Sequence, residues 1–383
     1  MTTRLLSRLF GLLFVAGLLA PPATGQDVRE LIGVLRREGA TALEADPDPA
    51  TRRQQFTTYL NVLAAEEQGQ ERMRGTIAFG LNGDETGDEQ LYKINAGISL
   101  ARGQYPSQVE FASRVGVTLD GDAFQENVSD LRLSYDYHPS LSWETFVFLE
   151  RRTDNFMSID QRYEVGGGVV LNRFLGLTED GRARREALAL RDAVQPVFRA
   201  LLSPAEQQAM DRAHARALPA IRKRHSRTRL ALLVGVLAEF EQATLTWTAP
   251  DGTTVDERAQ GRRSKLRWEV RPTLDVQPVD GLEWKLRPYL KLPSPWVWTE
   301  TIGRGTTATQ RADYRLDLYT DLTISLGGSE VFGGGVSLTL SYQMLYDHAP
   351  PYARVEPPGG EPILLQAEDL HHVVRLSFGL QFR

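Results

Sequence analysis

The residues best suited to chemistry lie in two short segments near the C-terminal end of the chain. They combine imidazole and carboxylate groups, which could bind a divalent metal ion or form an acid and base pair. The set is Asp347, His348, Glu368, Asp369, His371 and His372. If the two segments belong to paired antiparallel strands, these residues should come together as a cluster near the extracellular rim. Its spacing matches no established metal motif, so we predict structural roles for these residues, no metal ion and no cofactor.

Charged residues also recur at every second position in several segments. Alternate residues of a strand point to one face, so these side chains should share a face. The set is Arg114, Arg132, Lys265, Arg267, Glu269, Arg271, Lys285, Arg287, Arg315, Asp317 and Asp321. On the inner wall of a pore, the basic members would favour anions. Alternatively, opposite charges could pair across a narrow lumen and close it.

Other catalytic signatures are missing from the sequence. It has no Cys, and it has no Gly-x-Ser-x-Gly, His-Glu-x-x-His or glycine-rich phosphate loop. Gly166, Gly167 and Gly168 form a strand glycine run, which indicates close packing or a bend. The chain is therefore predicted not to be an enzyme, although a hydrolase at the cell surface stays open as the alternative.

The elements that would position the charged residues are strands with a strict alternation. In the last thirteen residues an apolar row from Val374 to Phe382 alternates with a polar or small row that includes Arg375 and Gln381. Such a strand has lipid on one side and water on the other.

Twelve such segments follow residue 73, an even number, as a closed antiparallel bacterial barrel requires. They lie at about 77–81, 92–100, 109–119, 131–137, 143–152, 163–171, 230–240, 266–276, 284–290, 314–324, 336–346 and 371–383. Short connections follow even strands, and long ones, at 249–263, 293–312 and 348–368, follow odd strands. We predict a mainly β protein, a 12-stranded antiparallel transmembrane β-barrel with periplasmic helical segments over residues 73–383.

The N-terminal residues 1–25 read as a secretory signal peptide. Arg4 and Arg8 precede an apolar stretch that is too short to span a bilayer as a helix. Their removal would take the formal net charge from −5 to −7. With no cysteine to lipidate, the mature chain is predicted not to be a lipoprotein. The signal peptide and the strands together predict a multi-pass barrel in the outer membrane of a Gram-negative bacterium.

Two segments have helical rather than strand periodicity, at 26–72 and about 178–226. Each contains amphipathic helices, and Ser203, Pro204 and Glu206 form a capping-box sequence between the second pair. The four helices could dock together on the periplasmic side. The second segment could instead fold into the lumen as a plug.

A basic run ends the second helical segment, from Arg222 to Arg229. It could contact anionic lipid headgroups, but a solvated helix end is the slightly favoured interpretation. Nucleic acid is not a sensible partner for an exported acidic chain. The expected partners are outer-membrane lipids, the barrel-assembly machinery during biogenesis, and small solutes.

The stretch from Phe148 to Phe156, followed by Ile159 to Tyr163 and the glycine run, resembles the salt-induced outer-membrane protein family. The resemblance covers roughly residues 73–383 and implies a signal-bearing barrel without catalytic residues. The helical insertion and Asn82-Gly83-Asp84-Glu85 depart from the family pattern. The expected function is envelope integrity or restricted passage of small solutes; a soluble ligand-binding β-protein is a weaker possibility.

Overall fold

The computed structural model describes residues 25–382 except 72–73, 87–88, 105, 121–122, 155–157, 249–253, 259–262, 294–298, 305–306, 330–333, 356–362 and 368. The signal-peptide prediction and Trp296, Trp298, Glu368 and Arg383 lie outside the described residues. The chain divides into two compact units, one helical and one built of strands.

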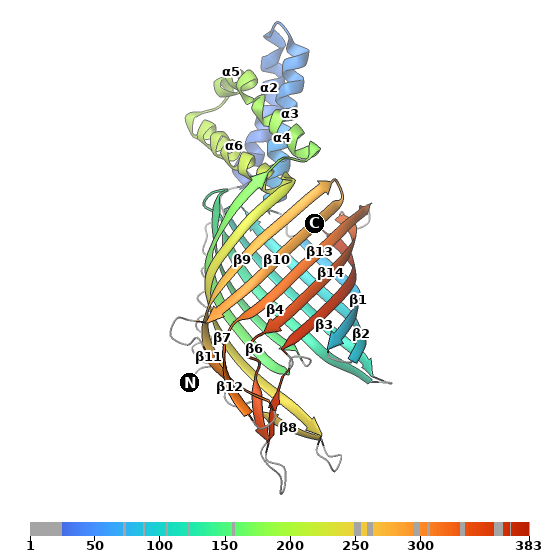
Figure 1. Ribbon diagram of the computed structural model, residues 1–383. Coiled ribbons are helices and arrows are strands. Elements are labelled where there is room, and N and C mark those ends of the chain that lie inside the picture. Colours follow the sequence, from blue (N-terminus) through green and yellow to red (C-terminus); the bar gives the residue numbers. More distant parts are fainter. Residues whose placement is uncertain are drawn as a thin grey trace. The chain divides into compact units, whose positions relative to one another are not determined.

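The strand unit is a closed antiparallel β-barrel (Figure 1). Its sheet has thirteen strands, of which β8 (Thr254–Arg258) pairs only with β7, and the other twelve close through the pairing of β6 with β7. The twelve are β1 (Arg74–Thr86), β2 (Glu89–Gln104), β3 (Ser107–Asp120), β4 (Ala123–Tyr137), β5 (Trp143–Asp154), β6 (Ile159–Leu175), β7 (Thr228–Thr248), β9 (Arg263–Val279), β10 (Leu282–Pro293), β13 (Arg315–Ser329), β14 (Gly334–Asp347) and β17 (Leu370–Phe382). The predicted twelve-stranded barrel is confirmed.

Alternation along each strand separates an apolar outer face from a polar lumen. In β9, Leu266 and Trp268 expose 48% and 46% of their surface, while Arg267 and Glu269 between them are fully buried. A water-soluble protein would have the opposite arrangement, with charge outside and leucine inside. The outer face of this barrel is therefore suited to lipid.

The two ends of the barrel differ in their connections. At one end the β4–β5, β9–β10 and β13–β14 connections are short, and Gly281 takes a φ of +86° in the tightest of them. At the other end lie the long loops, which contain strands that the sequence did not predict. They are β8, β11 (Thr299–Arg304), β12 (Thr307–Ala312), β15 (Tyr352–Val355) and β16 (Ile363–Gln366).

The helical unit contains α2 (Gly25–Ala42), the 3-10 turn η1 (Leu43–Ala45), α3 (Pro49–Glu71), α4 (Glu179–Ala189), α5 (Arg191–Leu201) and α6 (Pro204–His225). The segment before Ser203 was predicted as one helix, but it is two, separated at Leu190. Pro196 lies inside the second of these helices, which continues through it to Leu201. None of the described helices is long and apolar enough to cross a membrane.

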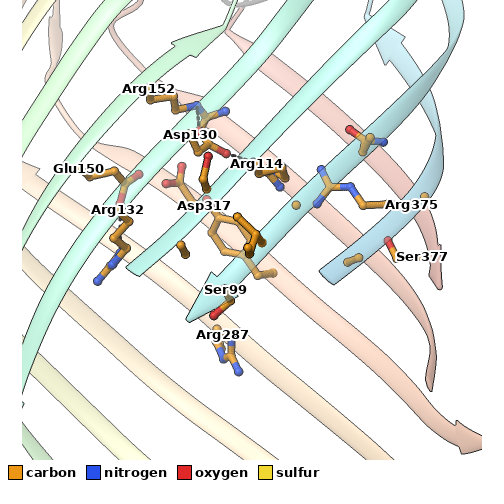
Figure 2. A pocket seen from close by; sticks show the side chains of 18 of the residues that line it. Ser99, Arg114, Asp130, Arg132, Glu150, Arg152, Arg287, Asp317, Arg375 and Ser377 are labelled. Carbon is orange, nitrogen blue, oxygen red and sulfur yellow. Dashed lines mark hydrogen bonds and ion pairs between the residues drawn. The ribbon is translucent and has the colours of Figure 1, made fainter. Parts of the chain in front are cut away.

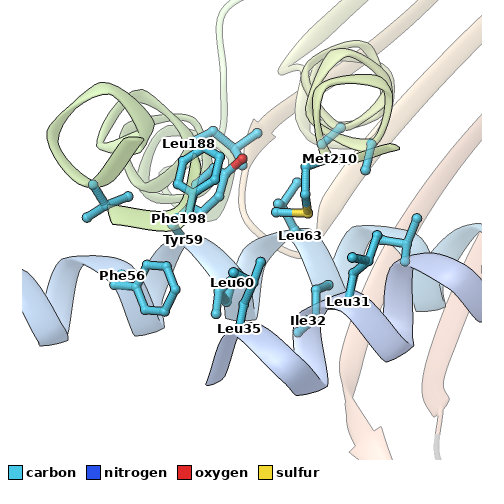
Figure 3. Close-up of a cluster of buried hydrophobic side chains, with 14 of the residues drawn as sticks. Leu31, Ile32, Leu35, Phe56, Tyr59, Leu60, Leu63, Leu188, Phe198 and Met210 are labelled. Carbon is cyan, nitrogen blue, oxygen red and sulfur yellow. The ribbon is translucent and has the colours of Figure 1, made fainter. Parts of the chain in front are cut away.

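The helices share one apolar core, shown in Figure 3. Leu35, Leu60 and Phe198 from three different helices are almost fully buried in it, and Tyr59 stacks on Phe198 with ring centroids 6.2 Å apart. The predicted docking of the two helical segments is confirmed. The capping box is present too, since the Ser203 hydroxyl donates to Glu206 Oε2 at 2.6 Å and the Ser203 amide at 2.8 Å.

One prediction concerns the pH dependence of the helical unit. Burial, with a smaller contribution from the charge of Arg191, lowers the pKa of His214, whose Nδ1 lies 3.3 Å from the Tyr59 hydroxyl. The unfolded chain should then bind a proton more readily than the folded unit, so stability is full above the ordinary histidine pKa of about 6.5 and falls as pH drops below it. Helical circular dichroism during thermal unfolding at neutral and mildly acidic pH measures this. His214→Gln should weaken the dependence, and the barrel variant His348→Gln should leave it unchanged.

Candidate functional site

The C-terminal histidine and carboxylate residues do not form one site. The strands pair as expected, with Leu345 opposite His371, but adjacent residues of a strand point to opposite faces. His371 is buried, while His372 hydrogen-bonds the Tyr342 hydroxyl at 2.7 Å. The set is therefore divided between two faces, with Asp347 and His371 inward and His372 outward, and no group of His, Cys, Asp and Glu within the described residues could hold a metal ion.

The remaining members of that set have separate surroundings. His348 stacks on Tyr314 with centroids 4.5 Å apart, and its Nδ1 lies 2.7 Å from the Tyr346 hydroxyl. The Asp369 carbonyl accepts from the Asp347 amide at 2.8 Å. Asp347 itself is buried and belongs to a network of ion pairs in the lumen.

Arg315 is the centre of that network, at the long-loop end of the lumen. Its Nε donates to Asp347 Oδ2 at 2.7 Å, its Nη1 to Glu239 Oε2 at 2.7 Å, and its Nη2 to Glu241 Oε2 at 2.9 Å. All four side chains are at most 3% exposed. Since β7, β13 and β14 contribute these groups, the network crosses the lumen surfaces of β9 and β10.

A second arginine extends the same network. The fully buried Arg267 lies 3.5 Å from Glu239 and donates to Asp313 Oδ1 at 2.9 Å, while Lys265 Nζ lies 2.9 Å from the other Asp313 oxygen. Arg162 Nε donates to Glu241 at 2.7 Å. These contacts place three of the sequence-selected residues, Lys265, Arg267 and Arg315, in one buried cluster.

Ion pairs continue toward the middle of the lumen. Lys291 of β10 donates to Glu164 of β6 at 2.5 Å, and Arg132 donates to Glu150 at 3.1 Å. Arg114 pairs with Asp130 on the neighbouring strand. Asp317 is buried in this region, and Asp321 lines a small cavity of about 180 Å³ beside Arg114.

Further contacts between charged side chains lie nearer the short-turn end. Arg271 donates to Glu269 at 2.8 Å and lies over the Tyr289 ring, 4.1 Å from its centroid. Lys285 lies 2.8 Å from Glu283, and both are partly exposed. Arg287 lies 3.9 Å from Asp275, a weak contact for a cation in the lumen.

Two aromatic side chains of β5 occupy the lumen beside aliphatic residues of β6 and β7. Phe146 and Phe148 are buried with ring centroids 6.1 Å apart, and the Arg132 guanidinium lies 4.6 Å from the Phe148 centroid. The glycine run makes room for them, because a Cβ on Gly166 would come within 2.7 Å of the Phe148 ring. The sequence therefore pointed correctly to close packing at these glycines.

A cavity of about 440 Å³ remains in the lumen, as Figure 2 shows. Small residues line part of it, among them Gly80, Gly97 and Ser377 from β1, β2 and β17. Among the described residues, eight Arg and Lys side chains line it against four carboxylates, and three of the arginines also pair with carboxylates outside the lining. The eight are Arg114, Arg132, Arg152, Arg162, Arg271, Arg287, Lys291 and Arg375.

Four residues of the lumen ion pairs were outside the set selected from the sequence, namely Arg152, Asp154, Glu239 and Glu241. Arg152 donates to Asp154 at 2.6 Å, and Glu239 and Glu241 hold Arg315. Their inward direction could have been predicted, because the alternation of β5 and β7, continued to the strand ends, puts all four on the inner face. The apolar residues on both faces of β5 obscured it there.

The fold is that of an outer-membrane β-barrel: a closed, even-numbered antiparallel sheet with an apolar exterior and a charged lumen. Among solved structures, the chain is similar to the NanC porin (6% identity, 79% of this chain and 98% of that chain, TM-score 0.35). It is also similar to the translocator domain of the autotransporter NalP from Neisseria meningitidis (9%, 88% and 98%, 0.32) and to an outer-membrane channel from Pseudomonas putida F1 (7%, 81% and 95%, 0.34).

The sequence matches no protein-family model and no curated protein. The resemblance to the salt-induced outer-membrane protein family stays a prediction. Likenesses this distant carry no argument, so the function has to be argued from the residues of the lumen.

Proposed function

We propose that this chain is an integral barrel of the Gram-negative outer membrane that lets small solutes pass through a restricted lumen, with a preference for anions. The observation that carries the proposal is the lumen cavity, whose lining has more cations than carboxylates. Rings of Arg and Lys favour anions in a pore because they lower the electrostatic energy of an anion there. The small residues of β1, β2 and β17 provide the free volume.

The ion pairs explain why passage would be restricted. Arg315 and Lys291 each reach a carboxylate on a strand three positions away in the sheet, so their side chains fill one side of the lumen. Solutes would therefore pass along the opposite side, past Arg375 of β17 and the small residues of β1 and β2. A purely structural role in the envelope would require this remaining space to be closed.

Membrane integration has its own test. The outer face exposes large apolar side chains such as Phe79, Leu81 and Leu376 along its strands, so the chain should partition with lipid. We expect extraction of the protein from an outer-membrane fraction only with detergent. Extraction by alkaline carbonate or salt would contradict integration, and would leave a soluble ligand-binding role.

Selectivity is tested by reversing one lumen charge. Arg287→Glu places a carboxylate in the cavity beside Asp275, so in proteoliposomes the ratio of acetate flux to methylammonium flux should fall severalfold. Arg151→Glu makes the same charge change on an exposed outward-facing residue of β5 and serves as the matched control. Equal acetate-to-methylammonium flux ratios in both variants would show that the solutes do not pass through the cavity.

A further inference from the structure

The seam between β9 and β10 is interrupted near its middle. Leu274 pairs with Leu286, and Val270 pairs with Leu290. Pro272 and Pro288 therefore lie opposite each other between these two pairs, at a point where β9 and β10 are not paired. Proline has no N–H and is normally excluded from central strands. Two opposed prolines therefore leave a gap in the hydrogen-bond ladder of a closed wall.

An apolar groove of about 420 Å³ lies over the gap on the outer face. Pro272 and Pro288 line it together with Leu232 and Leu286. Arg173 lines the same groove, is exposed, and forms no ion pair within the described residues. An apolar surface beside an unpaired cation fits a molecule with an apolar chain and an anionic head.

The inner face of the same seam lines the lumen cavity. Arg271 and Tyr289 are the neighbours of the two prolines in sequence and point inward, as does Arg287 on the other side of Pro288. The Arg271 guanidinium rests on the Tyr289 ring and covers this part of the wall. A single layer of backbone, with its ladder interrupted, thus separates the apolar groove from the basic cavity.

We propose that the β9–β10 seam is a side opening of the barrel, through which an amphiphile with an anionic head and one apolar chain moves between the lumen and the lipid. This inference rests on the membrane location proposed above, but it does not require conduction along the barrel axis. The anionic head of the amphiphile contacts arginines on both sides of the wall, and its apolar chain contacts leucines in the groove.

The energetics favour this seam over its neighbours. In lipid an unpaired backbone carbonyl costs several kcal/mol, and the neighbouring β7–β9 and β10–β13 seams pair without a break alongside the prolines. Separating β9 from β10 breaks fewer hydrogen bonds, because neither proline donates one. The Arg271 and Tyr289 side chains are the contacts that must move.

The test uses a chain with no native cysteine, so an introduced pair can form only one disulfide within the molecule. Leu274→Cys with Leu286→Cys, opposed residues next to the prolines, locks the seam when oxidised. The matched control is Leu322→Cys with Leu340→Cys, an opposed outward pair on the β13–β14 seam, where pairing is continuous from Arg315 to Ser325. The probe is palmitic acid with a photoreactive diazirine next to its carboxylate, added to proteoliposomes.

We expect the probe to label the groove peptides and, inside, the peptides with Arg271 and Tyr289. Oxidation of the β9–β10 pair should remove most of the inner adducts and keep the outer ones, reduction should restore them, and the control pair should have no effect. Pro272→Val with Pro288→Val should also lower the inner adducts by completing the ladder. Inner adducts that persist in the locked form, or that never occur, would overturn the proposal, whereas absence of outer adducts would point to a failure of membrane location.

Discussion

Arg315→Met should destabilise the barrel by about 3–5 kcal/mol, because removing one partner of a buried ion pair leaves uncompensated charge. Methionine keeps much of the side-chain volume, so lost packing is a minor part of the change. Three buried carboxylates, those of Glu239, Glu241 and Asp347, would lose their shared cation. Arg267 and Arg162 would still contact two of them, whereas Asp347 would lose its ion pair and keep the Ala349 amide, which donates to it at 3.1 Å. Urea unfolding of the lipid-reconstituted chain measures the effect.

Lys285→Met is the matched control for this experiment. It removes a cation from the same wall, but Lys285 and Glu283 expose 28% and 42% of their side chains. Exposed pairs contribute about 0–1 kcal/mol, so this variant should unfold at nearly the urea concentration of the unchanged protein. Equal destabilisation by both variants would mean that the Arg315 network does not hold the barrel together.

Gly168→Ala should prevent β6 and β7 from closing the barrel. A Cβ at this position would come within 2.5 Å of Gly235 Cα and nearer still to the Val234 carbonyl oxygen, both of which are backbone atoms that cannot rotate away. Overpacking costs typically about 1–3 kcal/mol, and a clash with the backbone lies at the upper end or above. Because β6–β7 is the pairing that connects the two ends of the sheet around the helical insertion, assembly into the membrane should fall sharply.

Membrane yield and resistance to unfolding in sodium dodecyl sulfate without heating report this defect. Gly97→Ala in β2 is the control, because its Cβ would meet the Ser113 carbonyl oxygen at 3.4 Å, an ordinary contact. Normal yield of both variants would show that close approach at Gly168 is not required.

The architecture was predictable because lipid enforces a strict alternation. Each of the twelve wall strands has an apolar outer row, and this period of two is visible in segments such as Leu266 to Val276. The strands of the long loops lack that constraint. Thr307–Ala312, for example, has no apolar row, and its pairing with β11 depends on contacts that the sequence pattern does not record.

The site was predictable only in part, for two different reasons. Opposite faces for His371 and His372 follow from their adjacency in one strand, so their separation could have been predicted from the sequence. By contrast, Lys291 and Glu164 are 127 positions apart and meet only because of the order and stagger of the strands around the barrel. The alternation along a strand determines whether a residue points inward or outward. The stagger of the strands around the barrel determines which residue of another strand it contacts.

The most direct measurement of the central claim is the reversal potential of the purified chain in a planar bilayer under a potassium chloride gradient. The excess of arginine and lysine around the lumen cavity predicts small conductance steps and a reversal potential with the sign of chloride selectivity. Arg287→Glu removes positive charge and should shift the reversal potential toward the equilibrium potential of potassium. A potassium-selective reversal potential in the unchanged chain, or no conductance at all from folded and inserted protein, would contradict the account.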